Sequence, residues 1–349
     1  MVTKIGLDLG YANITISDSV AEIYREPSIA LIYKEPVSDA RRIISVGSEA
    51  LANGAFGEGG KEGILVRPFK NGLLFDHQIT KEIIDHAVRA VLPAEKVRCV
   101  LGLPSDMTDK QERELFSMLR EAGVDTALGV VRSVAAIIGS GYSPSMSVIS
   151  VNIGAQATEI AVLHKGAVLS LHREPVGGED FDRAVQEYIS NEGDVKVSLI
   201  VARAIKEKLG AVWKGKPNDS IDIEGTLSLT GNKLRMNVTT EDIVGVFEAP
   251  LRTLMQAIVN VVKKIPLDAV EPIFENGIVL TGGGAELFGM DKLMAKVLGI
   301  SVTKPDDAMD AVAKGLSRIN SFIPPKAKVE GKNITNDVAL FYEKRKKDK

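Results

Sequence analysis

The sequence predicts an α/β protein of two domains, and three observations point to this fold class. Its 349 residues exceed the roughly 250–300 residues at which a single hydrophobic core stops growing. Short apolar runs typical of strands alternate with longer segments of helical spacing. A strand, an acidic or amide residue, a glycine turn and a second strand occur around residue 8 and again around residue 152, which suggests a duplicated domain.

The first half of the chain opens on a hairpin. Lys4–Gly10 has the composition of a buried strand that ends in a glycine turn, and Ala12–Ser17 follows as a second strand. Residues 30–75 are irregular and rich in glycine, which indicates a small subdomain or a mobile surface region. The remaining elements expected here are a helix over Thr80–Leu92, a strand over Val97–Leu103 and a helix over about Thr108–Ala122.

The second half repeats the opening pattern at Val148–Gly154. Strands are expected next at Thr158–His164 and Gly166–Leu171, helices at Phe181–Ile189 and Val197–Leu209, and a short antiparallel insertion at 218–240. A single long helix over Glu241–Ile265, a strand over Gly277–Leu280, a helix from about Met290 and a last core helix over 310–320 complete the expected elements. The tail from Ile323 ends in a basic run, Lys344–Lys349, read as a solvated end; docking to an acidic partner or an anionic lipid is the alternative.

Composition excludes several classes of function. The net charge of −3 gives no general attraction for nucleic acid, and aromatic residues are only 5% of the chain. The only cysteine, Cys99, lies in an apolar run and is expected to be a buried hydrophobic residue. The four histidines have no metal-ligand spacing. No apolar stretch approaches the ~20 residues that span a bilayer and no signal pattern opens the chain, so a cytoplasmic location is expected.

The two glycine turns predict phosphate binding. Phosphates need several backbone N–H donors, and a glycine turn offers them without side chains in the way. Asp8, directly before the first turn, is suited to hold the water shell of a Mg²⁺ that bridges the β- and γ-phosphates. A third glycine loop, Gly282-Gly283-Gly284, leads into a helix late in the chain.

These three elements, in this order, resemble the phosphate 1, phosphate 2 and adenosine motifs of the superfamily of actin, sugar kinase and heat-shock chaperone ATPases. Within this superfamily, residues 4 to about 320 are similar to the MreB and MamK branch of bacterial actins. Of the two, the sequence resembles the MamK-like proteins more. The passages that carry the resemblance are Gly6–Asn13, Arg67-Pro68 with Asn71-Gly72, Gly102–Ser105, Asn152–Gly154, Thr158–Val162, Val176–Glu179 with Phe181-Asp182, Ile205–Leu209 and Gly277–Gly284.

The resemblance implies an actin-like ATPase fold, with two RNase-H-like domains that each carry a small inserted subdomain. The first domain would be residues 1–143 plus 308–322, with an insertion at about 30–75. The second would be residues 144–307, with an insertion at about 182–240, and 323–349 would form a C-terminal tail. Nucleotide would bind between the two domains.

The same resemblance implies roles for individual residues. Asp8 would anchor Mg²⁺ through water, and Lys206 and Glu207 would contact the adenosine side of ATP or ADP. The backbone groups that would cradle the phosphates and close over the nucleotide belong to Gly10, Tyr11, Ala12, Asn13, Gly154, Ala155, Gln156, Ala157, Gly178, Gly282, Gly283 and Gly284.

Departures from the family pattern predict slow hydrolysis. Tyr11 stands where Thr or Ser is usual, Asn152 where Asp is usual, and Ala155–Ala157 differs from the usual Gly-Gly-Thr. Arg132 stands where relatives carry the Glu or Gln that orients the attacking water, and a guanidinium cannot accept a proton at pH 7. Rescue by another carboxylate, Glu159 or Glu179, is the competing view.

The function expected from the resemblance is a cytoplasmic, head-to-tail filament of this chain that positions an organelle or other cargo. A cargo adaptor or a related actin homologue is the partner class left open; no nucleic acid is expected. No intrinsic membrane anchor is expected either, because the first strand starts at residue 4 and the Leu92–Lys96 loop is short and polar. The alternatives are an MreB-type cell-shape filament, a phosphotransferase and a pseudo-ATPase scaffold that does not form filaments.

Overall fold

The computed structural model describes residues 2–18, 22–34, 41–56, 63–70, 73–91, 96–227, 230–324, 327 and 330–347. The chain divides into two compact units. Unit 1 comprises Met1–Met146, Leu163–Leu171 and Asp310–Lys349; unit 2 comprises Ser147–Val162 and His172–Met309. One five-stranded sheet lies in unit 1 and a second is centred on unit 2.

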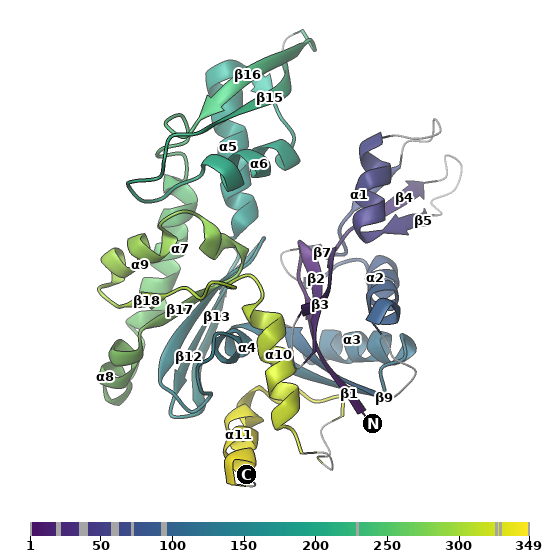
Figure 1. Cartoon of the computed structure of the whole chain (residues 1–349), viewed down its shortest axis with the longest axis vertical. Coiled ribbons are helices and arrows are strands. Elements are labelled where there is room, and N and C mark those ends of the chain that lie inside the picture. Colours follow the sequence, from purple (N-terminus) through teal and green to yellow (C-terminus); the bar gives the residue numbers. More distant parts are fainter. Residues whose placement is uncertain are drawn as a thin grey trace. The chain divides into compact units, whose positions relative to one another are not determined.

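The sheet of unit 1 has the strand order β10-β9-β1-β2-β3 (Figure 1). β1 (Val2–Leu9) and β10 (Thr126–Val131) each pair in parallel with β9 (Lys96–Leu103), which lies between them. β2 (Asn13–Ser17) pairs antiparallel with β1 and with β3 (Glu22–Pro27), as the predicted hairpin requires. The carboxyl ends of the three parallel strands therefore meet at one edge of the sheet, beside the first glycine turn.

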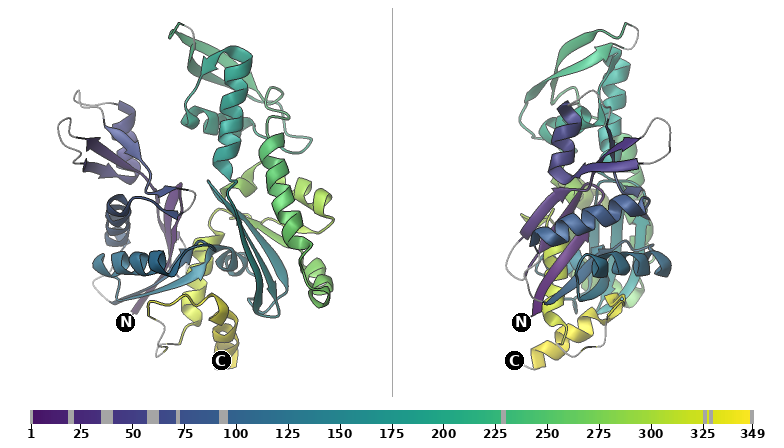
Figure 2. Two further views of the ribbon diagram at one scale, coloured as in Figure 1. Left: turned by 180° about the vertical axis from the view of Figure 1, so that it is seen from behind. Right: turned by 90° about the vertical axis from the view of Figure 1, so that its right-hand side faces the viewer.

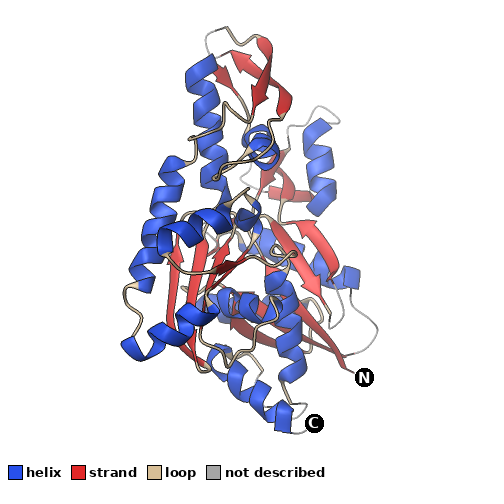
Figure 3. Cartoon of the chain, turned by 60° about the vertical axis from the view of Figure 1, so that its left-hand side comes forward, coloured by secondary structure: helices blue, strands red, loops and turns tan. Residues whose placement is uncertain are grey.

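Helices cover both faces of this sheet (Figure 3). Ile5, Leu7 and Leu9 point to one face, where α2 (His77–Val91) and α3 (Asp109–Glu121) complete a shared core. Gly6 points to the other face, where a Cβ would lie 2.4 Å from the backbone nitrogen of Ser317 in α10 (Ala311–Phe322). This close approach of α10 to β1 requires glycine. α4 (Arg132–Gly139) packs against α10.

The glycine-rich region at about 30–75 forms a small subdomain over its described residues (Figure 2). β5 (Arg41–Val46), β4 (Ala30–Lys34) and β6 (Ile64–Val66) make a three-stranded sheet that packs with α1 (Gly47–Phe56). Its own core contains Ile29, Leu31 and Ala50. A short ribbon, β7 (Phe69–Lys70) and β8 (Leu73–Leu74), follows. Asn71-Gly72 and residues 92–95 of the Leu92–Lys96 loop lie outside the described residues.

The second sheet has the order β13-β12-β11-β17-β18. Taken from its other end, β18-β17-β11-β12-β13, it matches the order β10-β9-β1-β2-β3 of the first sheet strand for strand. β17 (Ile278–Thr281) pairs in parallel with β11 (Val148–Ile153) and β18 (Val302–Thr303). β12 (Thr158–His164) and β13 (Ala167–Glu174) occupy the places that β2 and β3 hold in the first sheet. The repeated sequence pattern thus corresponds to a repeated sheet.

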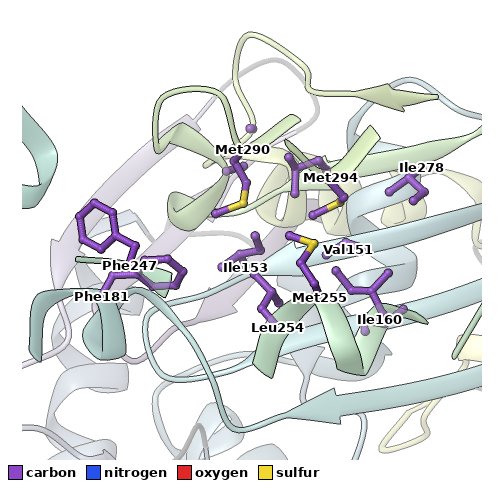
Figure 4. Close-up of a cluster of buried hydrophobic side chains, with 14 of the residues drawn as sticks. Val151, Ile153, Ile160, Phe181, Phe247, Leu254, Met255, Ile278, Met290 and Met294 are labelled. Carbon is purple, nitrogen blue, oxygen red and sulfur yellow. The ribbon is translucent and has the colours of Figure 1, made fainter. Parts of the chain in front are cut away.

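Helices of unit 2 bury the second sheet in a core that Figure 4 shows around Val151, Ile153 and Ile160. Phe181 and Phe247 meet there with ring centroids 5.6 Å apart. The contributing helices are α5 (Gly178–Gly193), α6 (Leu199–Leu209), α7 (Glu248–Val262), α8 (Leu267–Asn276) and α9 (Met290–Leu298). A smaller sheet of β14 (Val195–Lys196), β15 (Ser220–Leu227) and β16 (Lys233–Thr239) forms the predicted antiparallel insertion.

The prediction of one helix over Glu241–Ile265 is wrong at its start, because α7 begins only at Glu248. The preceding residues form turns, and Gly245 adopts a left-handed conformation (φ +87°) that interrupts a helix. Pro250 then lies in the first turn of α7, where a missing backbone N–H costs no helical hydrogen bond.

The C-terminal segment packs on unit 1, while Lys344, Lys346 and Lys347 of its basic end are exposed, as the sequence predicts. Gly331 and Ile334 donate backbone hydrogen bonds to Ala127 and Gly129, so the segment adds to the free edge of β10. α11 (Val338–Lys347) then packs against α10, with Val338 and Phe341 buried. The tail is therefore part of unit 1, and its sequence did not show this because the segment has neither strand alternation nor a clear apolar stripe.

The prediction that Cys99 is a buried hydrophobic residue is confirmed. Cys99 is fully buried in β9, and burial raises the pKa of its thiol. Among the described residues, no helix combines the length and the apolar character that crossing a bilayer requires.

Candidate functional site

The first glycine turn, Gly10–Asn13, joins β1 to β2 at the edge where the parallel strands end. A Cβ on Gly10 would lie 2.7 Å from the carbonyl oxygen of Asn13, so the turn is too tight for a side chain there. A tight turn that requires glycine is the kind of backbone that phosphate sites use.

Arg67 braces this turn and was not among the predicted site residues. Its Nη1 donates to the carbonyl oxygens of Tyr11 (3.0 Å) and Ala12 (3.1 Å). Its guanidinium also lies over the Tyr11 ring, 5.0 Å from the centroid. Tyr11, which departs from the usual Thr or Ser, thus stacks on the cation that fixes the turn. The only signal in the sequence was the Arg67-Pro68 pair, which the family resemblance already contained.

Arg132 reaches the predicted metal anchor. It is the first residue of α4, and its Nε lies 2.9 Å from Oδ1 of Asp8 while its Nη2 donates to the carbonyl oxygen of Leu9 at 2.5 Å. The two side chains are only 12% and 21% exposed. The charges of the two residues therefore compensate each other at the base of the first turn.

This pairing bears on the magnesium site that the family implies. A protein Mg²⁺ site uses one or two carboxylates whose negative charge balances the ion. Asp8 is already paired with the guanidinium of Arg132, which compensates its charge. A carboxylate in that state does not fit Mg²⁺.

The second glycine turn, Gly154–Ala157, lies against the N-terminus of α5. The backbone N–H of Gly178 donates to Gly154 and that of Glu179 to Ala155, at 2.9 and 2.7 Å. A Cβ on Gly177 would meet the backbone of Ala155 and Ala157 at 2.7 Å. The start of a 16-residue helix, with its positive dipole end, is thereby held beside this turn, an arrangement suited to an anion.

The two carboxylates considered as rescue bases differ in setting. Glu179 lies beside the second turn, where Gln156 donates to it at 3.0 Å and Arg183 contacts it at 2.5 Å. Glu159 is only 4% exposed within β12. Glu179 is therefore oriented by two donors, and moving it toward a substrate would break these contacts. Moving Glu159 would expose a buried carboxylate.

Lys206 is fixed inside unit 2. Its Nζ lies 2.6 Å from Oδ1 of Asp182, which is almost fully buried, and donates to the carbonyl oxygen of Gly178 at 3.0 Å. Lys206 therefore ties α6 to the N-terminus of α5, a positioning role that the sequence did not reveal. Glu207, the next residue, is exposed.

The third glycine loop, Gly282–Gly284, packs directly on the end of β11, the strand that precedes the second glycine turn. Gly282 has φ +85°, and a Cβ there would lie 2.4 Å from the carbonyl oxygen of Ile153. A Cβ on Gly284 would overlap the side chain of Ile153. Asn152 Oδ1 accepts a hydrogen bond from the Thr281 hydroxyl at 3.2 Å, so Asn152 is tied to this loop.

The predicted residues thus gather into two groups, one in each unit. Unit 1 brings together Asp8, the Gly10–Asn13 turn and Arg132; unit 2 brings together the Gly154–Ala157 turn, Gly178, Lys206 and the Gly282–Gly284 loop. Both groups contain a tight glycine turn, and both contain a cation held by an ion pair. This chemistry fits a polyphosphate.

A separate cavity of about 770 Å³ lies elsewhere in unit 2, lined by Trp213, Lys216 and Phe247 among others. None of the predicted site residues lines it. Lys296, which also borders it, lies 5.5 Å from the Trp213 ring centroid. Its size falls in the range of small-molecule pockets, so nucleotide-binding experiments need variants in the predicted site to assign the location.

Comparison with known proteins gives consistent results. The family described as MreB/Mbl protein matches residues 2–326. The cell shape-determining protein Mbl of Bacillus cereus is 27% identical over 318 residues, which cover 89% of this chain and 93% of that protein. The solved structure of MreB5 of Spiroplasma citri bound to ADP aligns with TM-score 0.84 at 21% identity, over 92% of this chain and 97% of that one. A MamK double helical filament aligns with TM-score 0.77 at 22% identity, over 93% and 100%. The two structural likenesses confirm the predicted actin-like fold.

Proposed function

We propose a function on the premise that the chain belongs to the MreB/Mbl family of bacterial actin homologues, to which the match over residues 2–326 assigns it. The chain binds ATP or ADP and assembles head-to-tail into cytoskeletal filaments in the cytoplasm. Its domains are those predicted, 1–143 plus 308–322 and 144–307, with the subdomains at about 30–75 and 182–240.

Nucleotide binding is supported by the two tight glycine turns, one in each unit. In this proposal the Gly10–Asn13 and Gly154–Ala157 turns bind the phosphates, the N-terminus of α5 adds its dipole, and Gly282–Gly284 lies against the nucleotide. Lys206 positions the start of α5 through Asp182 and Gly178. Lys206 and the exposed Glu207 remain the residues proposed for the adenosine side.

Assembly is supported chiefly by the likeness to MamK in its double helical filament, which this chain covers over that chain's whole length. A head-to-tail contact joins different surfaces of successive subunits and does not close, so it produces a filament. The organism-level role that we propose is the positioning of an organelle or other cargo, through an adaptor or a related actin homologue.

Sedimentation tests assembly. We expect the full chain to pellet at high speed in ATP and to stay largely in the supernatant without nucleotide, because nucleotide favours the assembly-competent conformation of each subunit. Gly282→Val places a side chain against the Ile153 backbone and should therefore abolish the pelleting in ATP. Gly193→Ala is the control in unit 2: it lies in the last turn of α5, and its Cβ would make only ordinary contacts, the nearest at 3.5 Å. A chain that never pellets would support a non-filamentous scaffold instead.

A cell-shape filament is the second candidate, because the relatives that match along most of the chain are cell shape-determining proteins. Such filaments would act at the membrane. If the positioning function holds, ATP-assembled filaments should not float with neutral phosphatidylcholine vesicles. Filaments without vesicles serve as the control, and efficient co-flotation would favour the cell-shape function.

A further inference from the structure

The Arg132–Asp8 pair is built into the strand edge of unit 1. Arg132 follows β10, Asp8 lies near the end of β1, and β9 runs between these two strands. Gly102 of β9 is the register partner of Asp8 and of Val130. A Cβ on Gly102 would lie 3.2 Å from Cγ of Arg132 and 3.4 Å from Oδ1 of Asp8. The side chain of Arg132 therefore passes closely over a glycine to reach the carboxylate.

The guanidinium is held on two sides, by the Asp8 carboxylate and by the carbonyl oxygen of Leu9. Leu9 directly precedes Gly10, so the guanidinium, paired with Asp8, lies at the beginning of the first glycine turn. A guanidinium is always charged, and its planar set of N–H donors matches the geometry of phosphate oxygens. A divalent cation placed at the same carboxylate would meet this positive charge at close range.

We propose that the chain binds its nucleotide without Mg²⁺, and that the guanidinium of Arg132, oriented by Asp8, supplies the positive charge that a metal ion supplies elsewhere. This inference rests on the proposed nucleotide-binding function. It assigns Asp8 as a positioning residue for Arg132 rather than as a metal anchor. The ligand class is a nucleoside di- or triphosphate in its metal-free form.

The direct test is the dissociation constant of ATP for the full chain, measured by calorimetry in excess Mg²⁺ and in excess EDTA. We expect the two values to differ by less than about threefold, which is under half of the ~1.4 kcal/mol that a tenfold change represents. A wild type that binds in Mg²⁺ and loses tenfold or more in EDTA overturns this proposal and leaves the proposed function standing. A wild type that binds in neither buffer overturns the proposed function itself.

Two substitutions separate the roles of the pair. Arg132→Gln should weaken binding in EDTA by about tenfold or more, because a charge-assisted contact to phosphate is lost. Arg132→Lys should recover part of the loss, since it keeps the charge without the planar donors. Arg89→Gln, which removes the same charge from an exposed pair with Asp85, is the matched control and should change nothing.

Asp8→Asn gives opposite results under the two roles. If Asp8 positions Arg132, the variant should bind ATP in Mg²⁺ as tightly as the wild type or more tightly. The amide oxygen of asparagine can still accept from Arg132 Nε, while a negative charge near the phosphates is removed. If Asp8 anchors Mg²⁺, affinity in Mg²⁺ should fall by tenfold or more while affinity in EDTA stays unchanged. Thermal melting of each variant confirms that it is folded, and the wild-type comparison decides the proposal without any variant.

Discussion

The double variant Arg132→Glu, Asn152→Asp is expected to release phosphate from ATP in Mg²⁺ about 10²–10⁴ times faster than the wild type, the range that a positioned base or water-orienting group contributes. In the wild type a guanidinium occupies the position of that group, and it cannot take a proton from water. Arg132 is also tied to Asp8 and Leu9, so it is not placed to move aside. The double change supplies a carboxylate at each of the two degenerate positions and releases Asp8 from its cation.

Steady-state phosphate release measures this effect, with both single variants as controls. Arg132→Glu alone places a second carboxylate near Asp8 without a compensating metal site at Asn152, so we expect a smaller gain than in the double variant. Wild-type turnover as fast as that of ordinary bacterial actins would contradict the account. It would favour a rescue base, which Glu179→Gln would then identify, because Glu179 lies beside the second turn.

Gly315→Ala is expected to lower the stability of unit 1 by about 3 kcal/mol or more, above the usual cost of overpacking. α10 and α4 cross at Gly315 and Gly139, and a Cβ on Gly315 would lie 1.8 Å from the carbonyl oxygen of Ala135. A backbone atom cannot turn away as a flexible side chain can, so the helices must separate. Separation would disturb α4 and with it Arg132, so nucleotide affinity should fall as well.

Thermal unfolding followed by circular dichroism tests this expectation, and a loss of about 6–12 °C in melting temperature corresponds to the predicted change. Gly193→Ala is the matched control. It lies in the last turn of α5, and its Cβ would make only ordinary contacts, the nearest at 3.5 Å. The control should be neutral or slightly stabilising because alanine favours helix. An unchanged melting temperature for Gly315→Ala would show that the α4–α10 crossing is looser than described.

Much of the fold could be predicted because its signals are local. The paired runs at Lys4–Ser17 and Val148–His164 alternate and turn as hairpins, and both hairpins lie in sheets of the same order. Thr108 and Gln111 form the capping box that starts α3. The start of α7 was misplaced because its turns at 241–247 contain residues that also suit a helix.

The site was only partly predictable because its key contacts join distant residues. Arg132 and Asp8 are 124 residues apart, and their pairing depends on β9 lying between β1 and β10. Arg67 reaches back 56 residues to Tyr11, and Lys206 reaches Asp182 on another helix. Residue types at those positions showed that the family pattern was altered, but only the strand order shows that Arg132 neutralises the proposed metal anchor.

Negative-stain electron microscopy of the purified full chain, with and without ATP, tests the central claim most directly. The account predicts filaments in ATP that persist for as long as nucleotide remains, because slow hydrolysis leaves the bound triphosphate intact, and few or none without nucleotide. Absence of filaments in ATP, from protein shown by calorimetry to bind the nucleotide, would contradict the claim that this chain is a filament-forming actin homologue.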